Sequence, residues 1–599
     1  MPQTRHESAT GAAPLRAKPA AALRHMLRIG YGLADLRADL LAGVVVGIIA
    51  LPLSMALAIA SGVPPQHGLY TAIVAGATIA LLGGSRFQVS GPTAAFVVVL
   101  SPIAAEHGVG GLLVASMLAG VILVGLGAAR LGSLIQFVPH PVTTGFTAGI
   151  AVVIATLQLK DFLGLETGPM PAHYLERVVT LARAIPTARL PDVAIGSLAL
   201  AILVLWPRLF PRLAKAVPGP LAALVIATAL AEALRALAPD LGVATIASRF
   251  SFERDGVHVP GIPNLPPMFA LPWTFPGADG RPLALSLDLV RELVPAAFAI
   301  AMLGAIESLL SSVIADGMTG TRHDPDTELL AQGAGNLLAP FFGGIAATGA
   351  IARTATNIRA GARSPMASVF HAAFVLAAVM VLAPLLGHLP MTALAAMLLL
   401  VAWNMSELPH FVHVVRVAPR SDVVVLLVCF GLTVVFDMVI AVTVGILLAA
   451  LLFMRRMADI SQVTLVGREH AAISPPLPAG VLVYDIGGPL FFGAAQKAMS
   501  ALDTVEAHVS TVLLDVRDVP IMDATGLVNL ESTIDRLRRG GARVVLGGLQ
   551  PQPAEVLARA GIESDEDRVV VCERFDDAVA LARLLPPLRG KGEAPAGGA

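Results

Sequence analysis

Charged residues are scarce in this chain. Asp, Glu, Lys and Arg make up 14% of its 599 residues, whereas hydrophobic residues make up 56% and the mean hydropathy is +0.77. Soluble globular proteins carry about 25% charged residues, so the composition excludes an ordinary soluble protein and indicates a polytopic membrane protein. The formal net charge of −1 gives no support for nucleic-acid binding.

Cysteine is also nearly absent. Cys429 lies in an apolar run and Cys572 in a soluble-looking segment, which argues against a disulfide between them and against a CxxC-type metal site. The first 25 residues lack the pattern of a signal peptide. Walker A, GxSxG and HExxH constellations are missing as well. We therefore expect a protein that is not an enzyme and that uses neither a metal nor a cofactor.

Long apolar segments, in contrast, recur from Asp35 to Met454. They predict about 14 membrane spans, two of them of half length, because a full span needs about 20 apolar residues. The predicted spans are 39–60, 68–83, 91–105, 109–129, 142–159, 191–206, 218–238, 290–315, 327–341, 349–359, 366–386, 390–404, 422–437 and 438–454.

The basic residues predict the orientation of these spans. With the N-terminus inside, the predicted external loops have few Lys and Arg residues apart from Lys160 and the connection 239–289. The predicted cytoplasmic loops hold Arg86, Arg130, Arg208, Arg212, Lys215, Arg322, Arg359, Arg363, Arg416, Arg420, Arg455 and Arg456. This is the positive-inside pattern, so both termini are expected in the cytoplasm.

The two halves of the membrane region look alike. Gly83-Gly84 precedes Gly91-Pro92-Thr93-Ala94-Ala95, and Gly343-Gly344 precedes Thr348-Gly349-Ala350-Ile351-Ala352 at the matching place. Seven spans per half put the second half in inverted topology, which is typical of inverted-repeat transporters. Two half-helix N-termini would then face each other near the bilayer midplane. The alternative is that these Gly/Pro segments merely kink packed helices.

Half-helix N-termini present free backbone N–H groups and a positive dipole end, which suit an anion. The expected anion-binding groups are the backbone amides around Thr93, Ala94, Ala350 and Ile351, together with the Thr93 hydroxyl. Arg353 would add a full positive charge close by. The alternative for Arg353 is a permanent salt bridge or a cytoplasmic anchor.

Glu307 is an ionisable residue in the middle of an otherwise apolar or small-residue span, 296–314. A carboxylate there costs on the order of 3 kcal/mol or more and marks a functional site by default. Because low dielectric favours its neutral form, we expect Glu307 to bind a proton near neutral pH. Ser311, one turn on, would supply an oxygen to a cation. The alternative is a structural ion pair between Glu307 and Arg353.

After Arg456 the composition becomes that of a soluble α/β domain. Strands are predicted at 481–486, 511–515 and 542–546, and helices at 494–506, 524–539, 553–560 and 575–584. The predicted domains are a disordered basic cytoplasmic tail (1–34), a transmembrane domain (35–456), an α/β domain (471–585) and a disordered tail (586–599).

Several motifs together resemble the SulP family of anion transporters with a C-terminal STAS domain. The resemblance covers residues 35–585, and it depends on the number and order of the motifs. They are Pro52 with Met55-Ala56, residues 62–70, Gly91-Pro92-Thr93-Ala94-Ala95, residues 145–149 with Gln158-Leu159-Lys160, residues 262–266, residues 305–310 and Arg353-Thr354-Ala355.

This resemblance implies a core domain and a gate domain that move relative to one another, a homodimer, and Glu307 as the coupling carboxylate for H⁺ or Na⁺. It also implies that the α/β domain is a cytoplasmic STAS domain that binds a regulator. Its loop Met522-Asp523-Ala524-Thr525-Gly526 resembles the STAS loop that is phosphorylated in anti-sigma-antagonist proteins, with Thr525 at the phosphorylated position. The alternative role of this loop is to cap the next helix.

Gly83-Gly84-Ser85-Arg86-Phe87 and Gly304-Ala305-Ile306-Glu307 resemble the bacterial branch that contains the aerobic C4-dicarboxylate transporter. The resemblance therefore predicts proton-coupled uptake of succinate or fumarate across a bacterial inner membrane. The first span lacks the Pro-Gln-Gly-Met-Ala-Tyr pattern of sulfate-type members and reads Pro52-Leu53-Ser54-Met55-Ala56-Leu57. The alternatives are a sulfate or bicarbonate symporter coupled to H⁺ or Na⁺, an anion channel or exchanger, and a membrane-anchored signalling protein.

Overall fold

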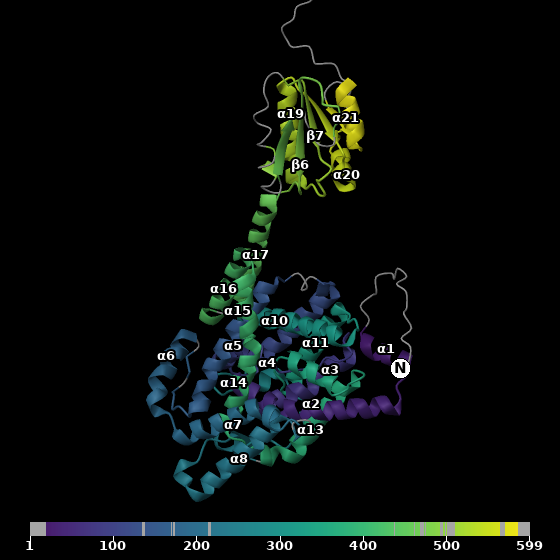
Figure 1. Ribbon diagram of the computed structural model, residues 1–599. Coiled ribbons are helices and arrows are strands. Elements are labelled where there is room, and N and C mark those ends of the chain that lie inside the picture. The colour runs from purple at the N-terminus through teal and green to yellow at the C-terminus, as the bar shows by residue number, and fades with distance from the viewer. Residues whose placement is uncertain are drawn as a thin grey trace, which may run out of the picture. The chain divides into compact units, whose positions relative to one another are not determined.

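The computed structural model describes residues 19–584, with gaps at 134–137, 169, 172–173, 214–216, 255, 437, 461, 468–472, 474, 492–494, 497–498, 500–508 and 563–568. The chain forms two compact units, residues 1–446 and residues 447–599 (Figure 1). The first unit is almost entirely helical, and the second contains a five-stranded sheet.

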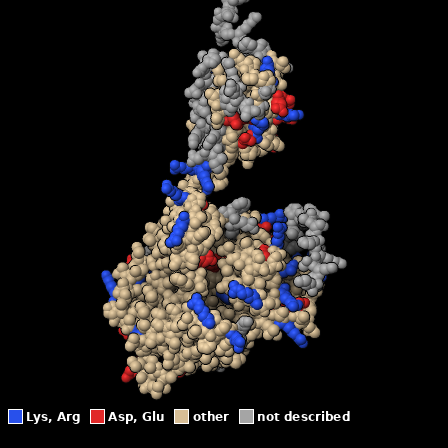
Figure 2. Space-filling model, in the orientation of Figure 1, with Lys and Arg blue, Asp and Glu red and all other residues tan. Residues whose placement is uncertain are grey.

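Each of the predicted spans overlaps a helix in the structure. These helices are α2 (Leu33–Ala60), α3 (Pro65–Leu82), α4 (Ala94–Ala128), α5 (His140–Leu163), α7 (Leu190–Leu209), α8 (Gly219–Leu237), α10 (Leu287–Thr319), α11 (Pro325–Leu338), α12 (Ile351–Arg359), α13 (Met366–Leu386), α14 (Met391–Ser406), α16 (Arg420–Val435) and α17 (Met438–Ile460). Within the described residues, nine helical segments are long and apolar enough to cross a membrane. Figure 2 shows that the visible face of this unit is largely uncharged, with isolated basic side chains.

The remaining helices of the first unit are short. They include α1 (Ala21–Ile29), α6 (Tyr174–Ala184), α9 (Ile246–Arg249) and α15 (Leu408–Val417). The connection 239–289 contains a hairpin of β2 (Ser251–Arg254) and β3 (Val257–Pro260). The prediction of a disordered tail over 1–34 was wrong for α1, whose first backbone N–H groups are near the end of α3: the Ala22 amide donates to the Gly83 carbonyl at 3.2 Å. Residues 1–18 and the predicted tail 586–599 lie outside the described residues.

Two predicted spans, 91–105 and 109–129, are joined in α4. Gly108 interrupts this helix with φ 68° and ψ −169°. Glycine adopts such a conformation readily because it has no Cβ, and a break of this kind kinks the helix. The segment from Ala94 to the kink is therefore a half-length helix, as the sequence predicted.

Glycine also sets the distance between α4 and α11. A Cβ added at Gly120 would lie 2.7 Å from the Leu337 backbone N, and one at Gly333 would lie 2.7 Å from the Val124 backbone N. Small residues on both helices thus let the two backbones approach closely, as is common between helices in membranes. This contact holds α11 beside the part of α4 that follows the kink at Gly108.

The two halves of the membrane unit meet in a short antiparallel ladder. β1 (Ser90–Gly91) precedes α4, and β4 (Thr348–Gly349) precedes α12. Ser90 pairs with Gly349, and Gly91 pairs with Thr348. The antiparallel pairing brings the start of α4 beside the start of α12, which is the arrangement that the predicted inverted repeat requires.

The second unit contains the sheet β5-β6-β7-β8-β9. Its strands are β5 (Gln462–Gly467), β6 (Val481–Gly487), β7 (Thr511–Asp515), β8 (Arg543–Gly547) and β9 (Val569–Cys572), and its helices are α19 (Ala524–Arg539), α20 (Pro551–Arg559) and α21 (Phe575–Leu584). β5 is antiparallel to β6 and the other neighbours are parallel. The predicted α/β class is confirmed, although β5 and β9 were not predicted. The predicted helix 494–506 lies mostly outside the described residues.

Candidate functional site

The starts of α4 and α12 are free of side-chain caps. Thr93 is the N-cap residue of α4 and Ala350 that of α12, and neither side chain accepts a hydrogen bond from the first turn. The first-turn N–H groups of a helix have no partner within the helix. Thr93, Ala94, Ala350 and Ile351, the predicted anion-binding residues, therefore lie together at two helix ends. The Ala350 amide is already engaged, because it donates to the Val89 carbonyl at 2.9 Å, so the donors on offer at the start of α12 are those of the first helical turn.

Buried side chains hold the backbone just before β4, and a hydroxyl of β4 itself adds one more bond. The Asn336 side chain donates to the Ala347 carbonyl and accepts from the Ala347 amide, both at 2.8 Å. The Thr71 hydroxyl accepts from the Ile345 amide at 2.7 Å, and the Thr348 hydroxyl donates to the Gly304 carbonyl at 2.7 Å. These bonds fix the start of α12 before any substrate binds, so the N–H groups there are preorganised.

Glu307 contacts the start of α4 directly. The Thr93 hydroxyl donates to Glu307 Oε2 at 2.8 Å, and the Glu307 side chain is half-buried. Glu307 and Arg353 interact electrostatically, but within the described part of the chain no ion pair of 4.0 Å or less joins them. The alternative of a direct structural ion pair is thus not realised in this conformation.

Arg353 connects α12 to the residues before α4. Its side chain is 3% exposed, and its Nη2 donates to the Pro92 carbonyl. Its Nε and Nη1 are buried and have no hydrogen-bond partner among the described residues. A Cβ at Gly91 would lie 2.7 Å from Nη1, so glycine is needed there to accommodate the guanidinium. Arg353 therefore offers a buried positive charge with two unused donor groups next to the helix ends.

Ser311 contacts α12, whereas Glu307 contacts the start of α4. Its hydroxyl donates to Thr354 Oγ1 at 3.1 Å, and Thr354 Oγ1 also accepts from the Val89 amide at 3.1 Å. In this conformation Ser311 contacts α12 and, among the described residues, makes no hydrogen bond with Glu307. Its predicted role as a cation ligand stays a prediction.

Sequence reasoning missed a second polar cluster behind β1. Ser308 accepts from Gln88 Nε2 at 2.8 Å and donates to Glu328 Oε1 at 3.4 Å. Gln332 Nε2 donates to Ser90 Oγ at 3.1 Å and to Glu328 Oε1 at 3.2 Å. Glu328, Gln332 and Asn336 recur every four residues, so they form a polar stripe on one face of α11. That spacing is the signal that could have revealed the cluster.

In the second unit, Thr525 is the second residue of α19 and is exposed. Asp523 is the N-cap, and its side chain accepts from the Gly526 amide at 2.7 Å. The Thr525 carbonyl accepts from the Asn529 side chain at 2.8 Å. Capping is therefore a role of Asp523, and the Thr525 hydroxyl is at an accessible position.

Family models match both units. A model described as the sulfate permease family matches residues 36–429, and a model of the STAS domain matches residues 473–578. The chain is 40% identical over 535 residues to the putative sulfate transporter YvdB of Bacillus subtilis, with 89% of this chain and 95% of the relative covered. It is 29% identical over 526 residues to the bicarbonate transporter BicA of Picosynechococcus sp., with 84% and 86% covered.

Solved structures give the same assignment of the fold. The overall structure of SLC26A9 matches with a TM-score of 0.78 at 19% identity, covering 97% of this chain and 98% of that one. The transmembrane domain of a cyanobacterial BicA matches with a TM-score of 0.57 at 26% identity, covering 70% and 98%. The protein is thus a multi-pass membrane transporter rather than an enzyme, and it belongs to the sulfate permease family of anion transporters with a C-terminal STAS domain.

Proposed function

We propose that this protein is a secondary active transporter that couples uptake of a small oxyanion to binding of a proton at Glu307. The observation that carries the proposal is the 2.8 Å hydrogen bond from Thr93 to Glu307. Among the described residues, Glu307 is the only acidic side chain that contacts the paired helix starts. The hydrogen bond joins it to Thr93, the N-cap residue of α4.

This contact couples the two ligands electrostatically. With Glu307 ionised, its negative charge opposes an anion at the neighbouring helix ends, and the Thr93 hydroxyl is occupied as its donor. With Glu307 protonated, the charge is gone and the Thr93 hydroxyl is released to bind the anion. Proton and anion then favour each other's binding, and the coupling is reciprocal. Na⁺ at Glu307 would act in the same direction.

The anion would be bound mainly by backbone N–H groups and by Arg353. Ala350 and Ala352 provide no hydroxyl, so the site supports recognition of charge and oxygen geometry more than of a particular group. The C4-dicarboxylates succinate and fumarate remain our substrate proposal from the sequence motifs. The names of the relatives support sulfate and bicarbonate as the competing substrates.

The test is uptake of labelled succinate, sulfate and bicarbonate by proteoliposomes under an inward proton gradient, with an inward Na⁺ gradient as the parallel condition. We expect one of these anions to accumulate when the proton gradient is imposed and to leak out when an ionophore collapses it. Accumulation driven by the Na⁺ gradient alone would show that the coupling ion is Na⁺ and not the proton. Uptake that only equilibrates under both gradients would contradict the proposal and favour a channel or an uncoupled exchanger.

The membrane orientation, the oligomeric state and the regulation of the protein are also proposals from the sequence. We propose a bilayer orientation with both termini in the cytoplasm, from the positive-inside pattern. A homodimer, a cytoplasmic regulator bound by the STAS domain and phosphorylation of Thr525 stay predictions; a phosphate at Thr525 would lie in the first turn of α19, where a negative charge is favourable.

A further inference from the structure

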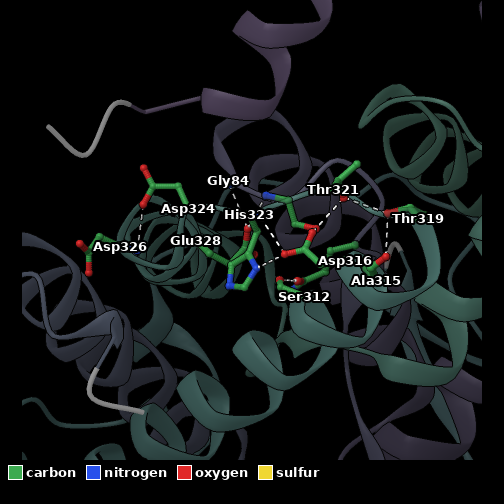
Figure 3. A network of polar contacts seen from close by, with 12 residues as sticks. Gly84, Ser312, Ala315, Asp316, Thr319, Thr321, His323, Asp324, Asp326 and Glu328 are labelled. Atoms are coloured by element: carbon green, nitrogen blue, oxygen red, sulfur yellow. Dashed lines mark hydrogen bonds and ion pairs between the residues drawn. The ribbon is translucent and has the colours of Figure 1, made fainter. Parts of the chain in front are cut away.

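Asp316 and His323 form a hydrogen-bonded pair where α10 ends and α11 begins, and the titratable side chain of Glu328 lies in the first turns of α11 (Figure 3). Asp316 Oδ2 is 2.7 Å from His323 Nδ1 and accepts from the His323 backbone N–H at 2.9 Å. The Thr321 hydroxyl donates to Asp316 Oδ1 at 2.9 Å. The side chain of Asp316 is 19% exposed and that of His323 is 6% exposed.

The bonds around Asp316 fix the tautomer of His323. An ionised carboxylate only accepts hydrogen bonds, and Asp316 accepts from the backbone and from Thr321. His323 Nδ1 is therefore the protonated nitrogen, and the lone pair is on Nε2. Nε2 is buried and has no hydrogen-bond partner among the described residues. In its neutral form the imidazole thus has an unused proton acceptor, Nε2, inside the protein.

Glu328 is the next group inward. It is 1% exposed, and its Oε2 accepts from the backbone amides of Gly84 at 3.0 Å and Ser85 at 3.1 Å. His323 and Glu328 interact electrostatically, but among the described residues His323 Nε2 makes no hydrogen bond with the carboxylate; Figure 3 labels both side chains. Glu328 Oε1 accepts from Ser308, which directly follows Glu307 on α10.

Three other charged groups lie near this set of titratable side chains, and one of them, Arg86, interacts with it directly. Arg86 interacts electrostatically with Asp316 and forms a hydrogen bond with His25 at 2.5 Å. Asp324 caps α11 by accepting from the Asp326 and Thr327 amides at 3.1 and 3.2 Å, and Asp326 accepts from the Gly132 amide at 3.0 Å. Among the described residues, neither Asp324 nor Asp326 therefore competes with Glu328, His323 and Asp316 for the proton.

We propose that Glu328, His323 and Asp316 are a proton relay that carries the coupling proton from Glu307 to the cytoplasm. Chains of Asp, Glu and His residues serve as proton pathways in membrane transporters. Asp316 interacts electrostatically with Arg86 and precedes Arg322 by six residues, and the positive-inside pattern places both arginines in the cytoplasm. This inference rests on the proposed proton coupling.

The Glu307 carboxyl loses its proton and the Glu328 carboxylate gains it. Glu328 then gives a proton to His323 Nε2, and the resulting imidazolium releases its Nδ1 proton to Asp316. Asp316 finally passes this proton to cytoplasmic water. The imidazole is left with its proton on Nε2, and a 180° flip of the ring turns this N–H toward Asp316 and presents an unprotonated nitrogen to Glu328 again. Glu307 and Glu328 are not hydrogen-bonded in this conformation, and neither are Glu328 and His323 Nε2, so each of these two transfers needs a bridging water or a side-chain rotation.

The relay is tested by comparing net uptake with exchange in proteoliposomes that contain the full chain with His323→Gln. A glutamine amide can still donate a hydrogen bond to Asp316. Unlike imidazole, it cannot take up a proton at one atom and release a different proton from a second atom. Net uptake requires the proton to leave Glu307 inside, whereas exchange of internal for external anion proceeds with the proton still bound. We expect net uptake to fall at least tenfold and exchange to stay within about twofold of wild type. Asp316→Asn is the second variant, with the same expectation.

The matched control is His388→Gln. His388 also contacts a carboxylate, Glu232 Oε1 at 2.8 Å, but it is largely exposed and lies after α13, outside the relay. We expect this variant to keep both net uptake and exchange.

Equal losses of uptake and exchange in the relay variants would overturn the inference by showing a structural role, and unchanged uptake would overturn it as well. A wild-type protein that ignores the proton gradient would refute the proposed coupling and the relay together, whereas gradient-driven wild-type uptake with intact relay variants would refute the relay alone.

Discussion

Glu307→Gln is expected to abolish accumulation of the anion against its gradient. With the membrane potential clamped at zero, one proton carried per anion down a gradient of two pH units can support about a 100-fold accumulation, since each unit is worth about 1.36 kcal/mol. Glutamine keeps the size of Glu307 and can still accept from the Thr93 hydroxyl, but it cannot bind and release a proton. We therefore expect the internal anion concentration to reach the external one and no more.

The measurement is the steady-state ratio of internal to external anion in proteoliposomes. Glu292→Gln is the matched control, because Glu292 lies on the same helix α10 but has a side chain that is 58% exposed. That variant should accumulate the anion like the wild type. If Glu307→Gln accumulated the anion as well, the Glu307 carboxylate would not be the coupling group, and another residue would have to bind the coupling ion.

Arg353→Gln is expected to weaken anion binding strongly. The buried guanidinium has two donor groups without hydrogen-bond partners among the described residues, and a hydrogen bond to a charged group is worth about 1.5–3 kcal/mol. Losing it should raise the KM for the anion about 10- to 100-fold, since 1.4 kcal/mol corresponds to a factor of ten. The KM is measured from initial rates of uptake at a fixed proton gradient.

Arg359→Gln is the control for this variant. Arg359 is on the same helix α12 but is exposed, so its loss should leave the KM within about twofold of wild type. Thermal unfolding of both purified variants in detergent separates binding from folding. An unchanged KM in Arg353→Gln would remove the arginine from the anion site, and a large fall in melting temperature with a small change in KM would make it a structural residue.

Much of the fold follows from hydropathy and from glycine and proline. The apolar runs are long enough to predict the spans, and the paired segments around Pro92 and Gly349 predict the two half-helices because broken helices at membrane depth are tolerated only inside protein or beside a cavity. The α1 helix was missed because nine residues with Arg24 and Arg28 among them show no span-like pattern. It is held by contacts with the end of α3, which are tertiary.

The candidate site was predictable only where local sequence determines it. Thr93 and Arg353 lie beside the half-helix starts, and the motifs identify those starts. The hydrogen bond of Ser311 to Thr354 depends on how α10 crosses α12, since the i+4 spacing fixes only the shared helix face with Glu307. Glu328 was missed because its partners come from Gly84, Ser85 and Ser308, which are far away in the sequence.

The most direct test of the coupling between Glu307 and the anion site is the dissociation constant of the transported anion as a function of pH, measured with purified wild-type protein and Glu307→Gln. Because protonation of Glu307 favours anion binding in our account, the wild-type Kd should fall as the pH falls, by up to tenfold per pH unit across the range in which Glu307 titrates. The Kd of Glu307→Gln should stay constant over the same range. A wild-type Kd that is independent of pH, or the same pH dependence in both proteins, would contradict the account.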